Sequence, residues 1–332
     1  MVDELRQLLT QGCSRHLCPG AALAVVEPDG EPILLTAGRF TYAETAPCVG
    51  VDSLFDLASL TKVLVTTTLV AQLYEQGRLD LDAPWEFLPS RPTPRDLLAH
   101  CSGFPPTYPL WKLPPGTDWL TLLKPEAEPR TASIYSDLNF LLLGEMVTWL
   151  EETPLEVLAE RRIFRPLSLQ DTCFCPLSAL RPRCVPTEIR PGDTEPLQGT
   201  VHDENAAWMG GVAGHAGLFS SLRDLARYAQ GLLRGGEPLL SSKTLKLFTT
   251  RANLVPGSSR CLGWDSPSLN SSAGQHIAPS AFGHTGFTGT SLWISPEQGK
   301  AVVLLTNAVC PRREAKGEAF FAWRRQLHDL VF

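Results

Sequence analysis

The chain has 332 residues, a formal net charge of −6, 43% hydrophobic residues and 19% charged residues. Its length allows about two domains, or one domain with an insertion, and its composition excludes a disordered protein. The basic residues are scattered along a slightly acidic chain, so we expect no nucleic-acid partner.

From the sequence we expect neither a membrane span nor an export signal. No stretch approaches the roughly 20 apolar residues of a transmembrane helix. The first residues mix Asp3, Glu4 and Arg6 with leucines, which is typical of an amphipathic helix and not of a signal peptide. Nine cysteines cannot all pair and show no repeated C-x-x-C spacing, so we expect a reduced, cytoplasmic setting and no metal site.

Strand-like runs lie toward both ends of the chain. Residues 21–27 and 32–39, joined by Pro28-Asp29-Gly30, predict a hairpin. Residues 289–294 and 300–307 predict two more strands, with a helix over 314–330.

Helical patterns dominate the middle of the chain. They cover residues 95–99, 137–150, 155–164 and 222–233, and the proline-rich stretches 84–129 and 176–196 are irregular. We therefore predict an α/β fold with a sheet domain of residues 1–62 and 200–332 and an inserted helical region of residues 63–199.

The first chemical motif is Ser59-Leu60-Thr61-Lys62. At a helix start, this spacing places a hydroxyl and an ammonium on one face, one turn apart, and a neutral lysine there could take the serine proton. Residues 61–70 contain seven β-branched residues, which favours a strand locally, but Gly77 as a stop signal makes a buried helix our prediction. The alternative is a capping serine and a surface lysine.

Two further motifs contain polar side chains beside a helix or strand start. Tyr135-Ser136-Asp137 precedes the helical run 138–150, where a phenol could exchange protons with a lysine or serine. Gly283-His284-Thr285-Gly286 precedes a strand and could bind a carboxylate or carbonyl. A buried tyrosine and a glycine-rich turn are the alternatives.

Taken in chain order, these motifs resemble those of the serine β-lactamase and penicillin-binding-protein superfamily, especially its class C-like branch. Ser59-Leu60-Thr61-Lys62 is similar to the S-x-x-K motif, Tyr135-Ser136-Asp137 to Y-x-N, and His284-Thr285-Gly286 to K-T-G. The segments 97–105 and 214–228 resemble further segments of that branch. The resemblance implies an antiparallel sheet from both chain ends flanked by helices, an all-helical insertion, and an active site at their junction.

The resemblance also implies roles for single residues. Ser59 would be the acylated nucleophile, and Lys62 and Tyr135 would share general acid–base catalysis, with the identity of the base left open. The N–H groups of Ser59 and Phe287 would form the oxyanion hole. Substrate would contact Asp137, His284, Thr285 and Gly286. No cofactor is implied.

Two departures from the family motifs affect the expected substrate. Asp137 stands where the family has an asparagine, and an ionised carboxylate has no N–H to donate to a substrate amide. His284 replaces a lysine, so the fixed positive charge is absent. The first departure weakens the expectation that the protein recognises β-lactams and peptides. The second weakens the expectation of a β-lactamase more than that of a hydrolase, since H-T-G is also found in carboxypeptidase and aminopeptidase members of this superfamily.

One more polar segment, His202-Asp203-Glu204-Asn205-Ala206, precedes a glycine loop that continues to His215. It resembles a subgroup linked to peptidoglycan turnover, so we predict that His202 and Asn205 face the substrate. A metal held by His202, Asp203 and His215 is the less favoured reading.

Together, these inferences predict a serine hydrolase that acts through an acyl-Ser59 intermediate on a small ester, a D-amino-acid peptide or a muropeptide amide. The first alternative is a D-alanyl-D-alanine carboxypeptidase or a weak class C-like β-lactamase. The alternative from another class is a non-catalytic penicillin- or peptidoglycan-binding module.

Overall fold

The computed structural model describes the chain from Met1 to Phe332 apart from Phe87, Pro89, Ser90 and Asn270. Three of these four residues belong to the proline-rich stretch 84–129, so the prediction of irregular structure there lies partly outside the described residues. The remainder of that stretch contains the short helix α3 (Pro94–Leu98) and two 3₁₀ turns, Leu110–Lys112 and Trp119–Leu122, and is otherwise irregular.

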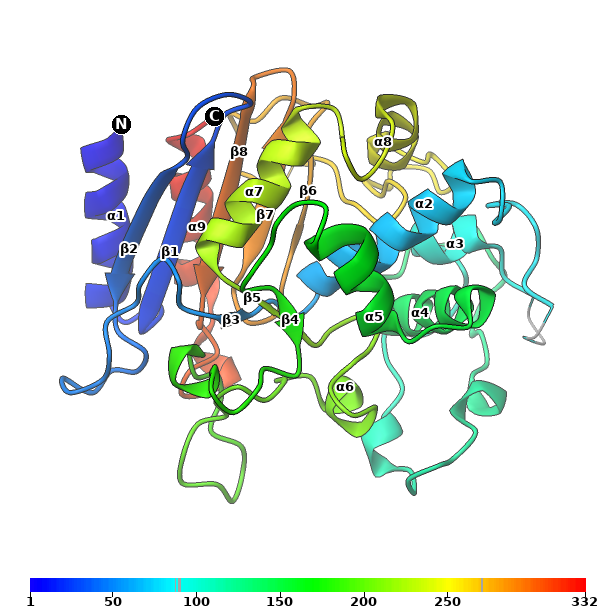
Figure 1. Ribbon diagram of the computed structural model, residues 1–332, viewed down its shortest axis with the longest axis horizontal. Helices are drawn as coiled ribbons and strands as arrows, with labels where there is room; N and C mark the ends of the chain where they lie inside the picture. Colours follow the sequence, from blue (N-terminus) through cyan, green and yellow to red (C-terminus); the bar gives the residue numbers. More distant parts are fainter. Residues whose placement is uncertain (87, 89–90, 270) are drawn as a thin grey trace.

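Strands that lie toward both ends of the chain form a five-stranded antiparallel sheet, as predicted. The strand order is β2-β1-β8-β7-β6. Its strands are β1 (Gly20–Val26), β2 (Ile33–Gly38), β6 (Phe282–Thr285), β7 (Ser291–Ser295) and β8 (Lys300–Thr306). β1 pairs with β2 as a hairpin and with β8 on its other side, with Ala21 opposite Thr306. Strand β6 is one edge of the sheet (Figure 1).

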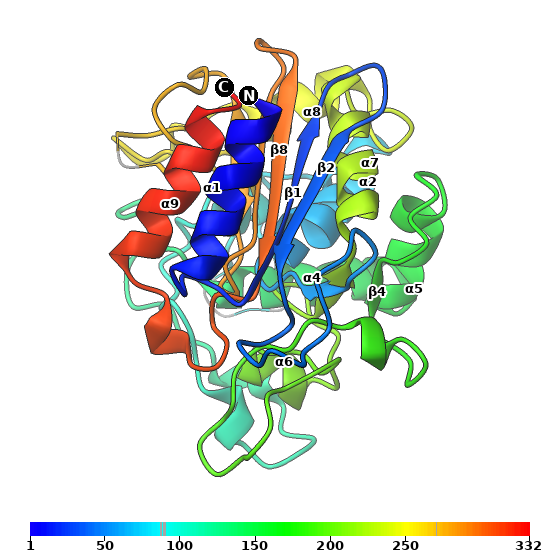
Figure 2. The same cartoon turned by 90° about the vertical axis from the view of Figure 1, so that its left-hand side faces the viewer.

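Helices cover both faces of this sheet, which is why β1 is buried along its whole length. Ala21, Leu23 and Val25 point into a core with α1 (Val2–Ser14) and α9 (Glu318–Asp329). The alternate residues of β1 point into the larger core on the side of α7 (Leu222–Leu233). Figure 2 shows α1 and α9 side by side on the first face. This is the period-two alternation of a strand buried on both sides.

The remaining helices lie on the side of the sheet where β6 forms the edge (Figure 1). They are α2 (Thr68–Glu75), α3 (Pro94–Leu98), α4 (Asp137–Glu151), α5 (Leu155–Ala159), α6 (Glu204–Trp208) and α8 (Ser242–Thr249). A small second sheet, β3-β5-β4, joins β3 (Phe55–Asp56), β5 (Leu218–Ser220) and β4 (Cys173–Phe174). The division into a sheet domain and an inserted helical region stays our proposal.

The helix after Ser59 forms despite its β-branched residues, as predicted. Its first part, Lys62–Thr67, is a π-helix that continues directly into α2, and every side chain of that part is buried. Packing on all sides outweighs the local preference of Val and Thr for strands. The helix ends before Gly77, which has a φ of +67°.

Candidate active site

Ser59 lies in a tight turn between β3 and the buried helix. Ala58 just before it has a φ of +47°, a left-handed conformation that costs a non-glycine residue roughly 1–2 kcal/mol. The Asp56 carboxylate accepts a hydrogen bond of 2.8 Å from the Ala58 N–H, and the Thr61 hydroxyl donates one of 2.7 Å to the Ala58 carbonyl. These bonds hold the strained turn that presents the Ser59 hydroxyl.

Lys62 is fully buried and lies at the centre of the site. Its Nζ is 2.9 Å from Ser59 Oγ, 3.0 Å from the His215 carbonyl oxygen and 2.6 Å from Asp137 Oδ1. Burial lowers the pKa of Lys62, but the negative charge of Asp137 and the Tyr135 phenol outweigh it, so the net shift of the pKa is upward. Lys62 is therefore an ammonium ion at neutral pH in the free protein.

Tyr135 comes directly before Ser136, the N-cap of α4, and interacts with the side chains of both Ser59 and Lys62. Its ring centroid is 5.2 Å from Lys62 Nζ. Burial is the main cause that raises the pKa of Tyr135, and the charge of Asp137 adds to it. The phenol is thus protonated at rest and can donate its proton.

His284, Thr285 and Gly286 lie at the end of the edge strand β6, beside the buried helix. His284 is only 4% exposed, and its Nδ1 is 2.8 Å from the Thr285 carbonyl oxygen. A carbonyl only accepts, so Nδ1 has the proton and Nε2 offers a lone pair. Burial, with Lys62 and Arg260 nearby, lowers the pKa of His284 to about 3. This imidazole is neutral at pH 7 and does not replace the charge of a lysine.

The loop that follows β6 is fastened to the strand that precedes Ser59. The hydroxyls of Thr288 and Thr290 donate to the carbonyls of Asp56 and Leu57, at 2.7 and 3.1 Å. A Cβ at Gly286 would lie 2.3 Å from the Leu57 carbonyl oxygen, so only glycine allows this approach. Within the described part of the chain, the backbone N–H groups of Ser59 and Phe287 donate to no protein acceptor. Such free donors are what an oxyanion hole requires.

A cavity of about 290 Å³ opens onto Ser59. The residues that line it are Ser59, Tyr135, Arg260, Asp265, Ser272, His284, Thr285, Gly286, Phe287, Trp293, Lys316, Phe321 and Arg324. Sequence reasoning missed the charged members of this set, which come from three separate segments without a motif. Asp137 is 25% exposed beside Lys62 and is absent from the lining.

His202 lies against the outer side of Phe287 and not in the cavity lining. Its ring stacks on the Phe287 ring with 5.6 Å between centroids, and its Nε2 is 3.0 Å from the Glu188 carboxylate. Arg313 pairs with the same carboxylate at 2.6 Å. Lys316 Nζ lies 3.9 Å from the Phe287 ring centroid and donates to the Phe287 carbonyl. The contacts of His202 and Lys316 together hold Phe287 in place.

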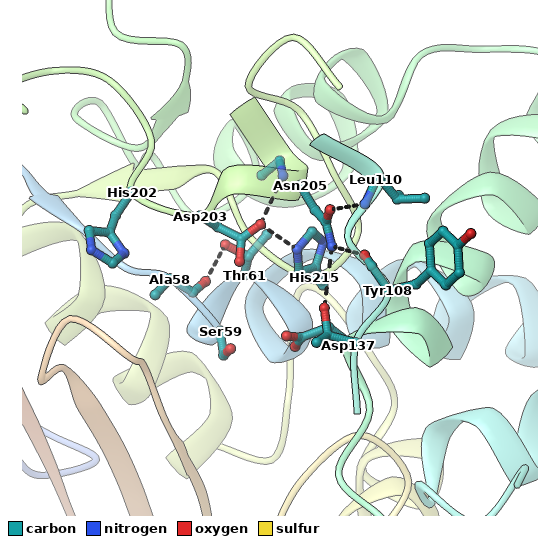
Figure 3. Close-up of polar contacts among 12 residues, drawn as sticks. Ala58, Ser59, Thr61, Tyr108, Leu110, Asp137, His202, Asp203, Asn205 and His215 are labelled. Atoms are coloured by element: carbon teal, nitrogen blue, oxygen red, sulfur yellow. Dashed lines mark hydrogen bonds and ion pairs between the residues drawn. The ribbon is translucent and has the colours of Figure 1, made fainter. Parts of the chain in front are cut away.

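Asn205, in contrast to the prediction that it faces substrate, holds a neighbouring loop. Its Oδ1 accepts from the Leu110 N–H, and its Nδ2 donates to the Tyr108 carbonyl, both at 2.9 Å (Figure 3). The segment 204–208 is the short helix α6 and not an open polar edge. Asn205 is buried and is also absent from the cavity lining.

Asp203 and His215 form a separate pair beneath Lys62. Asp203 Oδ1 is 2.8 Å from His215 Nε2 and accepts a hydrogen bond from the Ala206 N–H (Figure 3). Burial raises the pKa of Asp203, but the His215 ring and the Ala206 N–H outweigh it, and the net pKa lies well below its usual range. His202 and His215 thus use their Nε2 atoms on different carboxylates, those of Glu188 and Asp203, and among the described residues these side chains do not form one cluster of metal ligands.

Residues 5–325 match the family model described as Beta-lactamase. The chain belongs to this family. N-acetylmuramyl-L-alanine amidase of Bacillus subtilis (strain 168) is 32% identical, with 87% of this chain and 77% of the relative covered. A putative D-alanyl-D-alanine carboxypeptidase of Escherichia coli O157:H7 is 34% identical, with 77% and 69% covered.

Solved structures of the β-lactamase fold superpose over nearly the whole chain. Simvastatin synthase (LovD) from Aspergillus terreus has a TM-score of 0.79 at 18% identity, covering 99% of this chain and 98% of LovD. A class C β-lactamase has a TM-score of 0.78 at 17% identity, covering 99% and 94%. The predicted fold class and family are confirmed, and the protein is a serine hydrolase of the β-lactamase family. No helix among the described residues is long and apolar enough to cross a membrane.

Proposed function

We propose that the protein hydrolyses an amide of a muropeptide or D-amino-acid peptide, or an ester, through an acyl-Ser59 intermediate. The observation that carries this proposal is the contact of 2.9 Å between Ser59 Oγ and Lys62 Nζ at a cavity with two free N–H donors. The amide substrates are proposed because relatives that cover most of this chain are named for an amidase and a carboxypeptidase of such compounds.

The reaction begins with attack of Ser59 Oγ on the substrate carbonyl carbon. The Ser59 proton passes to the Lys62–Tyr135 pair. Lys62 must first lose a proton of its own, and the nearby Asp137 carboxylate is placed to accept that proton. The N–H groups of Ser59 and Phe287 stabilise the oxyanion, each donor contributing roughly 3–4 kcal/mol to the transition state. The leaving nitrogen or oxygen takes the proton that the Lys62–Tyr135 pair received from Ser59. Water then attacks the acyl carbon and gives a proton to the pair, which returns it to Ser59 Oγ as the carboxylic acid leaves.

His284 and Asp137 favour these substrates over penicillins. Asp137 faces Lys62 and has no N–H to offer to an acyl amide. His284 offers a lone pair at Nε2 and no charge, which suits a substrate N–H better than a carboxylate at this position. A D-alanyl-D-alanine carboxypeptidase or weak β-lactamase remains the second proposal, since one relative bears the first of these names.

A cytoplasmic location stays part of the proposal. The support for this location is that all nine cysteines are free thiols, because the reducing conditions of the cytosol keep thiols free.

The first test is the intact mass of the protein after treatment with a fluorophosphonate. Wild type should gain one adduct, because such a probe needs an activated nucleophile and a working oxyanion hole, and Ser59→Ala should gain none. Hydrolysis of muropeptides, esters and penicillins then ranks the substrates. Labelling without turnover of any of them would favour the non-catalytic binding module.

A further inference from the structure

His100 lies in the turn after α3 and holds the chain on both sides of Tyr135. Its backbone carbonyl oxygen accepts a hydrogen bond of 2.9 Å from the Ile134 N–H, and its ring Nδ1 accepts one of 3.1 Å from the Ser136 N–H. The residue before Tyr135 and the residue after it are thus bonded to the same partner. The His100 ring also packs on the phenol ring, with 4.6 Å between the centroids and an interplanar angle of 38°.

The ring of His100 is a fixed hydrogen-bond acceptor. Its side chain is 1% exposed, and its backbone has a φ of +53°, a left-handed conformation that few residues other than glycine and asparagine adopt. Because a peptide N–H can only donate, Nδ1 has the lone pair and Nε2 has the proton. Burial is the main cause that lowers the pKa of His100 well below its usual value, so the ring is neutral at pH 7. Nδ1 therefore remains an acceptor.

The start of α4 depends on such external acceptors. Ser136, the N-cap of this helix, makes no capping hydrogen bond with its own side chain, and its hydroxyl donates instead to the Pro105 carbonyl at 2.6 Å. The Asp137 N–H donates to the Pro106 carbonyl at 2.8 Å. The first N–H groups of a helix need partners from outside the helix, and here the loop after α3 supplies them. This loop therefore fixes where α4 begins, and with it the place of Tyr135.

We propose that His100 is a positioning residue for Tyr135, and that the hydrogen bond from the Ser136 N–H to its ring keeps the phenol oxygen in reach of Ser59 and Lys62. His100 is absent from the lining of the Ser59 cavity, so it acts through Tyr135 and not on the substrate. A displacement of about 1 Å at a reacting group can cost on the order of a hundredfold in rate. The inference rests on the proposed function, in which Tyr135 takes part in proton transfer.

The test replaces His100 by two residues that tolerate its backbone conformation and differ in the acceptor. His100→Gly removes the ring acceptor, whereas His100→Asn places an amide oxygen near the position of Nδ1. With one ester as substrate, His100→Gly should lower kcat about a hundredfold and leave KM within about threefold, because a misplaced phenol acts mainly in the transition state. His100→Asn should recover most of kcat. Equal losses of kcat in the two variants would overturn the proposal.

A double-mutant cycle with Tyr135→Phe separates positioning of the phenol from a general effect on the fold. Tyr135→Phe alone should lower kcat by about a hundredfold or more. Adding His100→Gly to it should cost less than about threefold further, because no phenol proton is left to place. The full hundredfold loss in that background would overturn the proposal. A wild-type kcat in Tyr135→Phe would overturn the role of Tyr135 in the proposed function, and the role of His100 with it.

Ser241→Ala is the matched control, because the Ser241 hydroxyl accepts the Thr244 N–H at the N-terminus of α8, at 3.3 Å. It should lower the urea midpoint, as the loss of a cap does, and leave kcat within about twofold. Nitrogen chemical shifts of wild type labelled with ¹⁵N-histidine give the tautomer of His100, whose signals are those missing from His100→Asn. We expect the proton on Nε2. A proton on Nδ1 would overturn the proposal even if His100→Gly fails to fold.

Discussion

The His202 imidazole stacks on the Phe287 ring at a centroid distance of 5.6 Å and an interplanar angle of 23°. Phe287 supplies a free N–H to the proposed oxyanion hole, yet half of its side chain is exposed. The stack, backed by Glu188 and Arg313, is what holds this residue in place. His202 is thus placed as a positioning residue, whereas the sequence predicted a contact with substrate.

His202→Ala should lower kcat about tenfold and leave KM within about twofold, because a misplaced donor acts mainly in the transition state. Steady-state kinetics on one ester measures the effects on kcat and on KM separately. His202→Phe retains an aromatic ring and should recover most of kcat. A rise in KM with kcat unchanged would instead support the substrate contact that the sequence predicted.

The ion pair between Lys62 and Asp137 should set the acid side of the pH–rate profile. Asp137→Asn removes the charge that raises the pKa of Lys62, and burial then lowers that pKa. If Lys62 must lose its proton before it accepts that of Ser59, the acid limb of kcat/KM moves to lower pH by about one unit or more. Glu152→Gln, which changes an exposed carboxylate after the other end of α4, should leave the limb in place. An unmoved limb in Asp137→Asn would point to Tyr135 as the base.

Ser59 and Lys62 should behave as a unit in mutant kinetics. Ser59→Ala and Lys62→Met should each reduce kcat/KM by about a thousandfold or more, and the double variant should lose little beyond either. Methionine is chosen because it fills the volume of the buried lysine stem. Circular dichroism reports whether the fold persists in each variant. Multiplicative losses would contradict a shared proton-transfer step.

Asn205 should matter more for stability than for chemistry. Asn205→Ala leaves the Leu110 N–H and the Tyr108 carbonyl without their partner, a loss of about 1–3 kcal/mol in the free energy of unfolding for buried groups. Urea unfolding measures this value, and fluorophosphonate labelling measures the site. Gln11→Ala on the exposed face of α1 is the control. If Asn205→Ala had normal stability but slow labelling, the prediction that Asn205 faces the substrate would be supported instead.

Mild acid should destabilise the protein through its buried histidines. Burial lowers the pKa of His284 and His328 to about 3, and that of His100 falls well below its usual value. Below pH about 6.5 the unfolded chain binds protons at these sites and the folded protein does not, so the free energy of unfolding falls as pH drops toward 3. Each such histidine contributes a slope of up to about 1.4 kcal/mol per pH unit.

Urea midpoints measured between pH 7 and 4 test this slope. His328→Gln, in the last turn of α9 and outside the lining of the Ser59 cavity, should make the dependence shallower. A midpoint independent of pH would mean that these rings are protonated in the folded protein.

The pattern of alternation and helical periods was enough to predict the sheet of β1, β2, β7 and β8 and most of the helices, because those signals are local. The three chemical motifs could also be assigned to one site. The structure joins the first two through Lys62, which contacts Ser59 and Asp137, and places the His284 ring 5.8 Å from that of Tyr135 at the same cavity. The short strands β3, β4 and β5 were not predicted, since strands this brief depend on their partners and not on their own pattern.

The roles of His202 and Asn205 could not be read from their segment. Four polar residues in a row predict an accessible edge, but α6 turns Asn205 toward the loop of residues 107–110, and His202 finds Glu188. Likewise Arg324 occurs in an ordinary amphipathic helix pattern, and only the tertiary structure shows that its charge faces a cavity. Contacts of this kind join distant segments and leave no spacing to recognise.

The pairing of β1 with β8 has a consequence for how the protein is made in the cell. Strand β1 begins at Gly20, but its neighbour β8 begins at Lys300 and is translated long after it. Phe287 and His284 are also synthesised late, so the nascent chain has the serine long before it has the oxyanion donors. The growing chain therefore cannot hydrolyse anything until β6 and the loop after it have been translated. The edge of the early β1–β2 hairpin that β8 will cover must wait unpaired, which makes folding of this sheet slow and this edge a natural point for chaperone binding.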